Sequence, residues 1–150
     1  MEAAHSEWGE SLISAVLFGS VARGEAGPES DVDLLLVVRG LPSGRFDRTD
    51  ALGPLDDAVE PTLTKLHAQG IPARVSPVLK TPAEAEKLVL LYLDLAEDGI
   101  LIVDRDDFFA RILERLRQRL AELGSERRRL GRVHYWVVKP GLKPGEVIRL

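Results

Sequence analysis

Residues 17–38, LFGSVARGEAGPESDVDLLLVV, constrain the fold more than any other part of the chain. An apolar run ends at a Gly-Ser pair, a polar loop with two further glycines follows, and two aspartates flank the start of a second apolar run. Short unbroken apolar runs are typical of strands in a sheet that is covered on at least one face. The pattern predicts strands at residues 15–18 and 33–38, with a polar loop between them.

The two aspartates, Asp31 and Asp33, are expected to lie side by side because residues i and i+2 of a strand point to the same face. Two carboxylates this close repel each other, and one takes up a proton unless a cation lies between them. Mg²⁺ prefers carboxylate oxygens and often shares them with phosphate oxygens. The pair therefore predicts a metal site that also holds a phosphorylated ligand.

The Gly-Ser pair, Gly19 and Ser20, is suited to a phosphate. A glycine lets the backbone approach a ligand closely, and a helix that starts after it offers free N–H groups. The Ser20 hydroxyl adds a donor. The motif is not the GxxxxGK[ST] phosphate loop, because the lysine is absent and the spacing differs. Alone, a Gly-Ser is most often a turn and an Asp-x-Asp a solvated strand end; the ordered combination predicts a phosphate cradle beside a metal clamp.

Composition sets the wider limits. A chain of 150 residues with 45% hydrophobic residues has the size and core of one domain, residues 1–150. The net charge of −4 argues against a protein that coats nucleic acid. The chain has no cysteine for a disulfide or a thiolate zinc site. No signal-peptide pattern and no apolar run of roughly 20 residues is seen, so a cytoplasmic location away from membranes is expected.

The rest of the chain alternates apolar runs with helix-like patterns, which predicts an α/β or α+β domain. Thr81 and Glu84 have the spacing of a capping box, and Asp104 or Asp106 is expected to cap the last helix. Pro72 and Pro77 favour a strand that lies near an edge or ends early. Helices are predicted at residues 3–12, 46–69, 81–97 and 104–123, a loop at 39–44, and further strands at 71–79, 100–103, 133–138 and 146–150, the last two joined by KPGLKPG in a strand-rich tail at about 127–150.

The motif GS-x10-DxD, in the form FGSxARGxxxxxSDxDLLV over residues 14–38, resembles the minimal nucleotidyltransferases of the DNA polymerase β superfamily. The end of the chain, HYWVVKPGLKPGEVIRL, is similar to the tails of small prokaryotic members. The resemblance implies an α+β polymerase-β-type fold, with a mixed sheet flanked by helices. It also implies Mg²⁺ and transfer of a nucleoside monophosphate from a nucleoside triphosphate, with ATP expected, to a hydroxyl.

The resemblance also assigns roles to residues of the motif. Gly19 and Ser20 would contact the triphosphate, and Asp31 and Asp33 would bind the metal and carry catalysis. Among supporting residues of the nucleotide site are Arg23, as a phosphate or structural contact, and Ser30, as a cap that fixes the loop.

One departure from the family pattern is a missing acid. Active members carry a third carboxylate on a later strand beside the pair, as metal ligand or general base. The corresponding segment here, IPARVSPVL, has Arg74 and Ser76 on the alternating face and no acid. The next acids, Glu84, Asp94 and Asp98, are interpreted as a helix cap and a solvated helix face.

Two functional hypotheses follow from the resemblance. In the first, the chain is an enzyme that transfers a nucleotide slowly, with assistance from the substrate or with residues completed by a partner. Small members of this kind resemble the antitoxin half of two-protein systems. The other half is a helical HEPN-type protein, and a tyrosine of that protein can be the acceptor. In the second, the chain is a nucleotide-binding or scaffolding module that neutralises such a partner. Transfer to a small molecule is a weaker hypothesis, and a homo-oligomer through exposed strand ends remains open.

Two other features of the sequence allow two interpretations each. The late arginines could form a patch for RNA or an acidic partner, but the interspersed glutamates favour an ion-paired helix face. Tyr135 and Trp136 could stack on a base, but packing against the core is the preferred interpretation. The three histidines show no metal-ligand spacing. The arginines in question are Arg111, Arg115, Arg117, Arg119, Arg127, Arg128, Arg129 and Arg132.

Overall fold

A four-stranded mixed sheet forms the centre of the computed structural model, which describes residues 8–131, 133–143, 145–148 and 150. The strand order is β3-β2-β1-β4; β1 runs antiparallel to β2 and β4, and β2 runs parallel to β3. This arrangement confirms the predicted α+β class. The strands are β1 (Leu12–Phe18), β2 (Val32–Val38), β3 (Val75–Lys80) and β4 (Ile100–Asp104).

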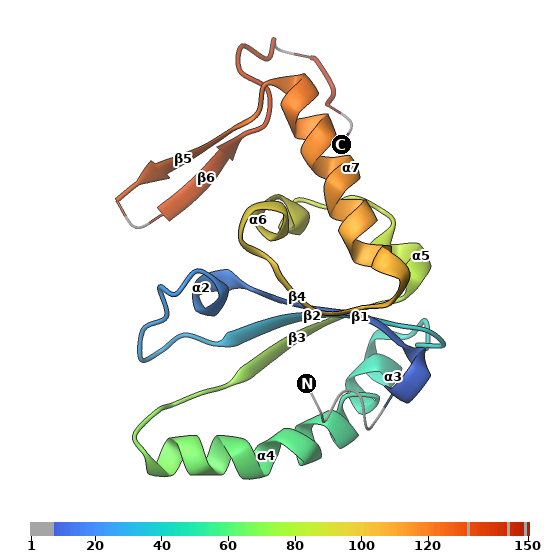
Figure 1. Ribbon diagram of the computed structural model, residues 1–150, viewed down its shortest axis with the longest axis vertical. Helices are drawn as coiled ribbons and strands as arrows, with labels where there is room; N and C mark the ends of the chain where they lie inside the picture. The colour runs from blue at the N-terminus through green and yellow to red at the C-terminus, as the bar shows by residue number, and fades with distance from the viewer. Residues whose placement is uncertain (1–7, 132, 144, 149) are drawn as a thin grey trace.

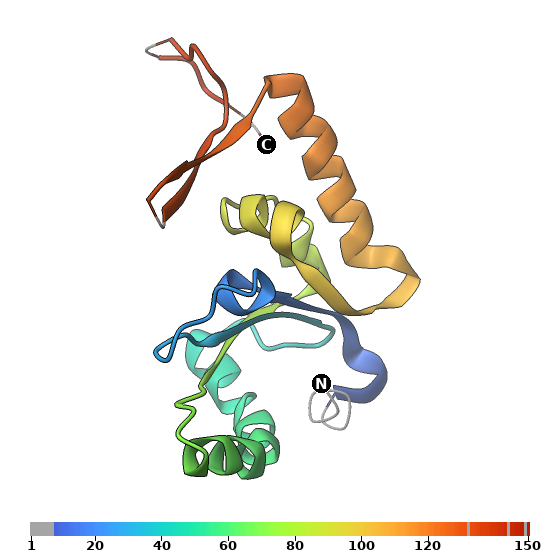
Figure 2. The same ribbon diagram turned by 60° about the vertical axis from the view of Figure 1, so that its left-hand side comes forward.

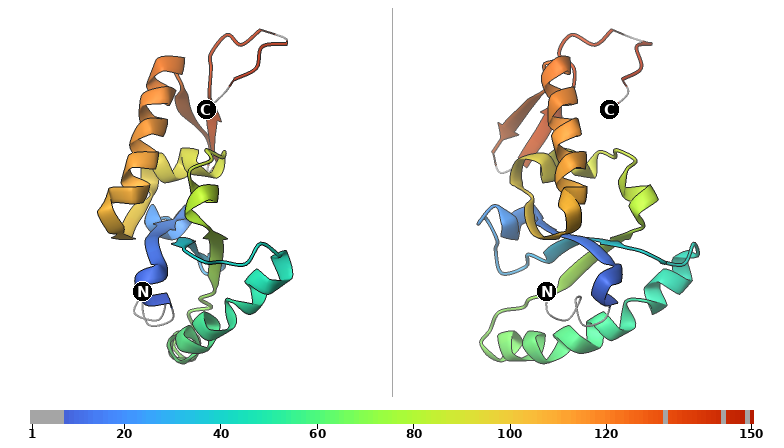
Figure 3. Two further views of the ribbon diagram at one scale, coloured as in Figure 1. Left: turned by 90° about the vertical axis from the view of Figure 1, so that its right-hand side faces the viewer. Right: turned by 45° about the vertical axis from the view of Figure 1, so that its right-hand side comes forward.

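Helices cover both faces of the sheet (Figures 1 and 3). On one face lie α5, α6 and α7, and on the other lie α3 and α4. No helix in the described part of the chain is long and apolar enough to cross a bilayer. The helices are η1 (Gly9–Ser11), α2 (Gly19–Ala22), α3 (Arg45–Asp50), α4 (Gly53–Ala68), α5 (Pro82–Ala85), α6 (Leu91–Asp98), η2 (Arg105–Asp107) and α7 (Phe108–Leu123).

Apart from Ser14 in β1 and Asp33 in β2, the two central strands are apolar, because both faces of the sheet are covered. Leu35 and Val37 of β2 pack toward α6 and α7, where Tyr92 meets Phe109 edge-to-face with ring centroids 5.2 Å apart. Leu36, the residue between them, packs on the opposite face with α4. Alternation along β2 thus supplies two cores from one run of leucines and valines. This double burial is what the unbroken LLLVV run indicated.

Several predicted boundaries in the first half are wrong. Leu12 belongs to β1 rather than to a helix, residues 9–11 form a 3-10 turn, and residues 3–7 of the predicted helix lie outside the described residues. The helix predicted over 46–69 is two helices, because Gly53 and Pro54 open a new one. The third strand begins at Val75 instead of residue 71, and its position at the sheet edge is as predicted from the prolines.

The capping box at Thr81 is confirmed, but the helix that it starts is short. The Glu84 N–H donates to Thr81 Oγ1 at 3.2 Å, and the Thr81 N–H donates to Glu84 Oε2 at 2.9 Å. The predicted helix over 81–97 is instead α5 and α6, with a break between them. Leu88, Val89 and Leu91, around the break, all pack against the core.

Glu84 also holds α3 against α5. Arg48 donates to both carboxylate oxygens of Glu84, at 2.9 and 2.8 Å. This hydrogen bond is the main reason that the pKa of Glu84 falls from 4.5 to about 2. A carboxyl group with a lowered pKa stabilises the fold above pH 4.5, and the stabilisation is lost as the pH falls toward 2.

The Glu84→Gln substitution is therefore expected to lower the free energy of unfolding by about 1 kcal/mol at pH 7, a value set by the partial exposure of the pair. Glutamine can still accept the hydrogen bond from the Thr81 N–H, so the loss of stability reports the contribution of the negative charge. Urea denaturation between pH 7 and pH 2 should show the difference from wild type shrinking below pH 4.5. The exposed Glu86→Gln variant is the control; an equal loss in that variant would contradict the assignment.

The C-terminal part forms a hairpin, with different strands from those predicted. Strand β5 (Glu126–Leu130) pairs antiparallel with β6 (Val133–Val137), and residues 145–148 and 150 form no strand. The chain leaves α7 through Gly124, whose φ of +66° ends the helix as predicted. The prediction missed β5 because its sequence, ERRRL, has no apolar alternation. In Figures 1 and 2 the hairpin tip lies on the same side of the molecule as α2.

The two faces of this hairpin differ in chemistry. Cross-strand partners share a face, so Arg127 lies with Trp136 and Arg129 lies with His134. We call these four residues the inner face, because Trp136 packs against the core and donates to Asp94 Oδ1 at 3.2 Å. The packing interpretation of Trp136 is thus confirmed, whereas Tyr135 is exposed. The outer face consists of Glu126, Arg128, Leu130, Val133, Tyr135 and Val137.

Candidate functional site

The Gly-Ser pair and the second aspartate meet at one end of the sheet. Phe18 at the end of β1 is the register partner of Asp33 in β2, and Gly19 follows with φ of +75°. A Cβ atom at position 19 would lie 3.2 Å from the Asp33 Cγ and would overlap its Oδ2. Glycine is therefore required at position 19 by conformation and by space. The backbone of the Gly-Ser turn lies directly against the carboxylate, as the sequence spacing predicted.

Asp33 is partly buried, and its electrostatic surroundings are mixed. Burial is the largest cause that raises its pKa above 3.8, and the nearby charge of Asp31 raises it further. A hydrogen bond from Ser76 and the charge of Arg23 act in the opposite direction. The net result is a carboxylate whose ionised form is disfavoured in the protein alone. A cation bound between Asp31 and Asp33 would relieve both the burial penalty and the repulsion.

The residues at this position fit a magnesium ion. Asp31 precedes β2 and is exposed, and Asp33 lies two residues further along, so both carboxylates are available at the same end of the strand. These are hard oxygen donors, and Mg²⁺ is commonly held by one or two carboxylates together with phosphate oxygens and water. Asp31 and Asp33 could hold such an ion, with coordination positions left for a nucleotide.

Ser76 occupies the position where a third acid would be expected. Strand β3 is parallel to β2, and Ser76 is the register partner of Asp33, so the two side chains share a face. The Ser76 hydroxyl donates a hydrogen bond to the Asp33 carboxylate. Within the described residues, no group of three or more acidic, histidine or cysteine side chains is placed to hold a metal. The strand therefore contributes a neutral donor at this point.

The three acids that follow in the sequence have structural partners. Glu84 caps α5, as predicted. Asp94 and Asp98 were expected on a solvated helix face, but this interpretation is wrong. Asp94 accepts from Trp136, and Asp98 accepts from Arg127 at 2.9 and 2.5 Å. The hydrogen bond from Arg127 is the main reason that the pKa of Asp98 is lowered.

Arg23 and Ser30 organise the loop between α2 and β2. Arg23 Nε donates to Glu25 at 2.9 Å, and its Nη1 lies 3.7 Å from Asp98. Ser30 Oγ accepts from the Gly27 N–H at 2.9 Å and so fixes the turn before Asp31. Arg23 also bears on Asp33, because its charge lowers the pKa of that group. The predicted site residues thus all lie in one region of the structure.

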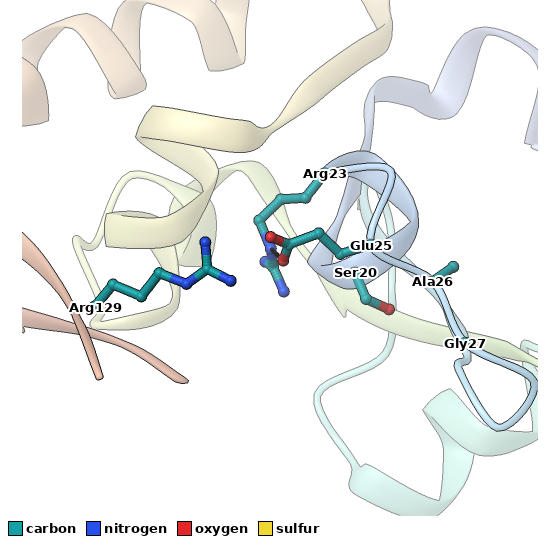
Figure 4. A pocket seen from close by; sticks show the side chains of 6 residues that line it. All are labelled: Ser20, Arg23, Glu25, Ala26, Gly27 and Arg129. Carbon is teal, nitrogen blue, oxygen red and sulfur yellow. Dashed lines mark hydrogen bonds and ion pairs between the residues drawn. The ribbon is translucent and has the colours of Figure 1, made fainter. Parts of the chain in front are cut away.

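A cavity of about 480 Å³ adjoins the Gly-Ser turn. Figure 4 shows Arg23 and Ser20 on one side and Arg129 reaching in from the hairpin on the other. Arg129 was not among the predicted site residues, because in the sequence it belongs to a cluster of arginines near the end of the chain. The sequence signal that could have indicated its position is the alternation that places Arg127 and Arg129 on one strand face, opposite Trp136 and His134 on the next. The lining residues are Ser20, Arg23, Glu25, Ala26, Gly27 and Arg129.

Among the arginines of α7, Arg117 and Arg119 form the ion pairs that the glutamates favoured, whereas Arg111 and Arg115 donate to the backbone carbonyls of Asp106 and Glu86. On α7, Arg119 pairs with Glu122 at 2.9 Å and Arg117 lies 3.9 Å from Glu114.

Asp104 accepts from the backbone N–H groups of Phe109 and Ala110, both at 2.9 Å, so its predicted capping role is confirmed.

A mixed sheet that presents a Gly-Ser turn against an Asp-x-Asp pair is the arrangement expected from the resemblance to nucleotidyltransferases. The family described as "Nucleotidyltransferase domain" matches residues 2–119, and the chain belongs to this family. The chain is also 38% identical over 116 residues to "Putative protein adenylyltransferase MJ1305" of Methanocaldococcus jannaschii, a match that covers 74% of this chain and 71% of that protein. The resemblance seen in the motif at residues 14–38 is thereby confirmed at the level of the family.

Solved structures with a related arrangement are more distant. A toxin–antitoxin complex with AMP-PNP has a chain with a TM-score of 0.48 and 14% identity, over 80% of this chain and 86% of that chain. A chain of the toxin–antitoxin MntA-HepT has a TM-score of 0.42 and 13% identity, over 80% and 84% of the two chains.

Proposed function

We propose that the protein is a Mg²⁺-dependent enzyme that transfers AMP from ATP to a hydroxyl group on a partner protein. The observation that carries the proposal is the contact of Gly19 with Asp33, which sets a phosphate-binding turn against a pair of carboxylates. The archaeal relative is named a putative protein adenylyltransferase, which supports ATP as donor and a protein as acceptor. The motif's resemblance to minimal nucleotidyltransferases supports a cytoplasmic antitoxin with a HEPN-type partner.

In this reaction each residue of the site would have its own role. Asp31 and Asp33 would hold the ion, Ser20 would donate to a phosphate oxygen, and Arg23 would stay oriented through Glu25 and Asp98. Bound magnesium would supply neutralisation of the phosphate charge and polarisation of the α-phosphate. The acceptor oxygen attacks the α-phosphorus, the bond to the bridging oxygen of the β-phosphate breaks, and pyrophosphate leaves. Positioning and electrostatics would supply the rate enhancement.

A base must accept the proton of the acceptor hydroxyl, and the presence of Ser76 opposite Asp33 indicates where that base must come from. A serine hydroxyl opposite Asp33 does not act as a base at neutral pH, so the proton would pass to a base from the substrate or the partner. The same observation favours a second candidate function, in which the site binds nucleotide and the chain neutralises its partner by binding alone. The two candidates differ in whether AMP becomes covalently attached.

The test is incubation of the protein with Mg²⁺, a HEPN-type protein as the proposed partner, and ATP radiolabelled at the α-phosphorus. Label is expected on a hydroxyl of the partner, and ATP labelled at the γ-phosphorus should leave none, because the terminal phosphates depart as pyrophosphate. Partner that is bound but unlabelled would refute transfer and support the binding module. Labelling from the γ-position would refute nucleotide transfer in favour of phosphoryl transfer.

A further inference from the structure

The β5-β6 hairpin is fixed beside the Gly-Ser turn by a shared carboxylate. Arg127 on its inner face donates two hydrogen bonds to Asp98 at the end of α6, at 2.9 and 2.5 Å. The same carboxylate lies 3.7 Å from Arg23, which follows α2. The hairpin is therefore attached to the group that orients a residue of the candidate site. The whole hairpin lies beyond residues 2–119, where the family match ends.

Arg129 extends from this fixed strand into the cavity. It lies two residues after Arg127 and so shares its face, and Figure 4 shows its guanidinium pointing across the cavity toward Arg23 and Glu25. Its Nε donates to the Gly131 carbonyl at 2.7 Å. Among the described residues it has no ion-pair partner within 4.0 Å. Its two terminal nitrogen atoms are thus available to an anion.

The cavity has the composition of an anion site. Arg23 and Arg129 face each other across it, the Ser20 hydroxyl lies at its wall, and Glu25 is the acid in the lining. Glu25 is already engaged by Arg23, whose hydrogen bond is the main reason that its pKa is lowered; the charges of His134 and Arg129 lower it further. An anion that enters would meet one guanidinium held in place by carboxylates and a second that has no carboxylate partner.

The position of the cavity indicates which anion. Ser20 lines the cavity, and Gly19 beside it touches Asp33, so an extended polyanion can run from the carboxylate pair past Ser20 to Arg129. We propose that Arg129 binds the β- and γ-phosphates of the nucleoside triphosphate, while the α-phosphate lies at Asp31 and Asp33. This inference rests on the proposed function and adds a residue from outside the matched family region to its site. Arg129 then holds the group that departs as pyrophosphate.

Calorimetric titration of the full chain with Mg²⁺ and nucleotide tests this proposal. The probes are AMP and the α,β-methylene analogue of ATP, which cannot lose pyrophosphate. The Arg129→Ala variant is expected to bind the ATP analogue about tenfold more weakly, as for the loss of a charge-assisted hydrogen bond, and to bind AMP with unchanged affinity. The Arg129→Lys variant should lie between the two, because it keeps the charge and loses the forked geometry.

The matched control is Arg128→Ala, which removes the same charge from the same strand but on the outer face, where Arg128 pairs with Glu126 at 2.7 Å. Its affinity for both nucleotides should equal that of wild type. Equal weakening of AMP and the ATP analogue in Arg129→Ala would overturn the proposal in favour of a structural role for Arg129. Unchanged nucleotide affinity with reduced labelling of the partner would overturn it in favour of acceptor binding. Failure of wild type to bind either nucleotide would instead refute the proposed function itself, and this inference with it.

Discussion

Replacement of Asp33 by asparagine is expected to reduce AMP transfer by about 10³-fold while leaving the fold as stable as wild type or more stable. Asparagine removes the negative charge that a divalent ion needs. It also removes a carboxylate whose ionised form is disfavoured, because burial and Asp31 raise the pKa of Asp33. Activity and stability should therefore move in opposite directions at this residue.

The pH dependence of stability shows whether Asp33→Asn is stable because it removes a disfavoured negative charge, or only because asparagine fits at this position. With a raised pKa in the folded state, ionisation of Asp33 lowers stability above that pKa and has no effect below the unfolded value near 3.8. The advantage of Asp33→Asn in the free energy of unfolding should be complete at pH 7 without metal and should disappear as the pH falls toward 3.8. Urea denaturation in the presence of a chelator measures it, and transfer of labelled AMP measures the activity.

Glu29→Gln is the matched control, since Glu29 is an exposed carboxylate of the same loop. Its transfer rate and stability should match those of wild type. If Asp33→Asn retained more than about a tenth of the wild-type rate, the carboxylate pair would not be the metal site, because loss of a ligating charge is far more costly than that.

Replacement of Gly19 by alanine is expected to lower the free energy of unfolding by about 1–2 kcal/mol for the left-handed backbone alone, and to reduce transfer by about 100-fold or more. The added methyl group would overlap the Asp33 carboxylate, so either that side chain or the Gly-Ser turn must move. Both are parts of the site, and displacement of reacting groups by about 1 Å is enough for a loss of this size. Thermal or urea denaturation and the labelling assay give the two measurements.

The Gly40→Ala variant separates the effect of the left-handed backbone from the steric overlap with the Asp33 carboxylate. Gly40 has the same φ of +75°, lies just beyond the other end of β2, and has nothing within 4 Å of an added Cβ. It should lose similar stability and keep its transfer rate. If Gly40→Ala and Gly19→Ala lost activity equally, general destabilisation would explain both, and contact with Asp33 would have no special role.

The sequence was most informative where structure depends on neighbouring residues. The Gly-Ser turn, the Asp-x-Asp pair and the apolar strands beside them lie within residues 12–38, and the β1-β2 pairing brings them together directly. Local chemistry also fixed the Thr81 capping box and the end of α7 at Gly124. In each case a short segment contains both the signal and the structure that it specifies.

It was least informative where distant segments meet. The role of Asp98 depends on Arg127, which is 29 residues away, and the approach of Arg129 to Ser20 depends on how the hairpin docks. Strand β5 consists mainly of charged residues, and of its two inner-face residues Arg127 binds the Asp98 carboxylate and Arg129 lines the cavity. A pattern search for apolar alternation cannot detect such a strand.

Pro77 has a consequence for the solubility of the protein. It lies within β3, at the edge of the sheet, and proline has no N–H to offer to an arriving strand. A second copy that tried to extend the sheet along this edge would therefore meet an interrupted ladder of hydrogen bonds. The residue that marked β3 as an edge strand thus also protects that edge against aggregation between copies of the chain.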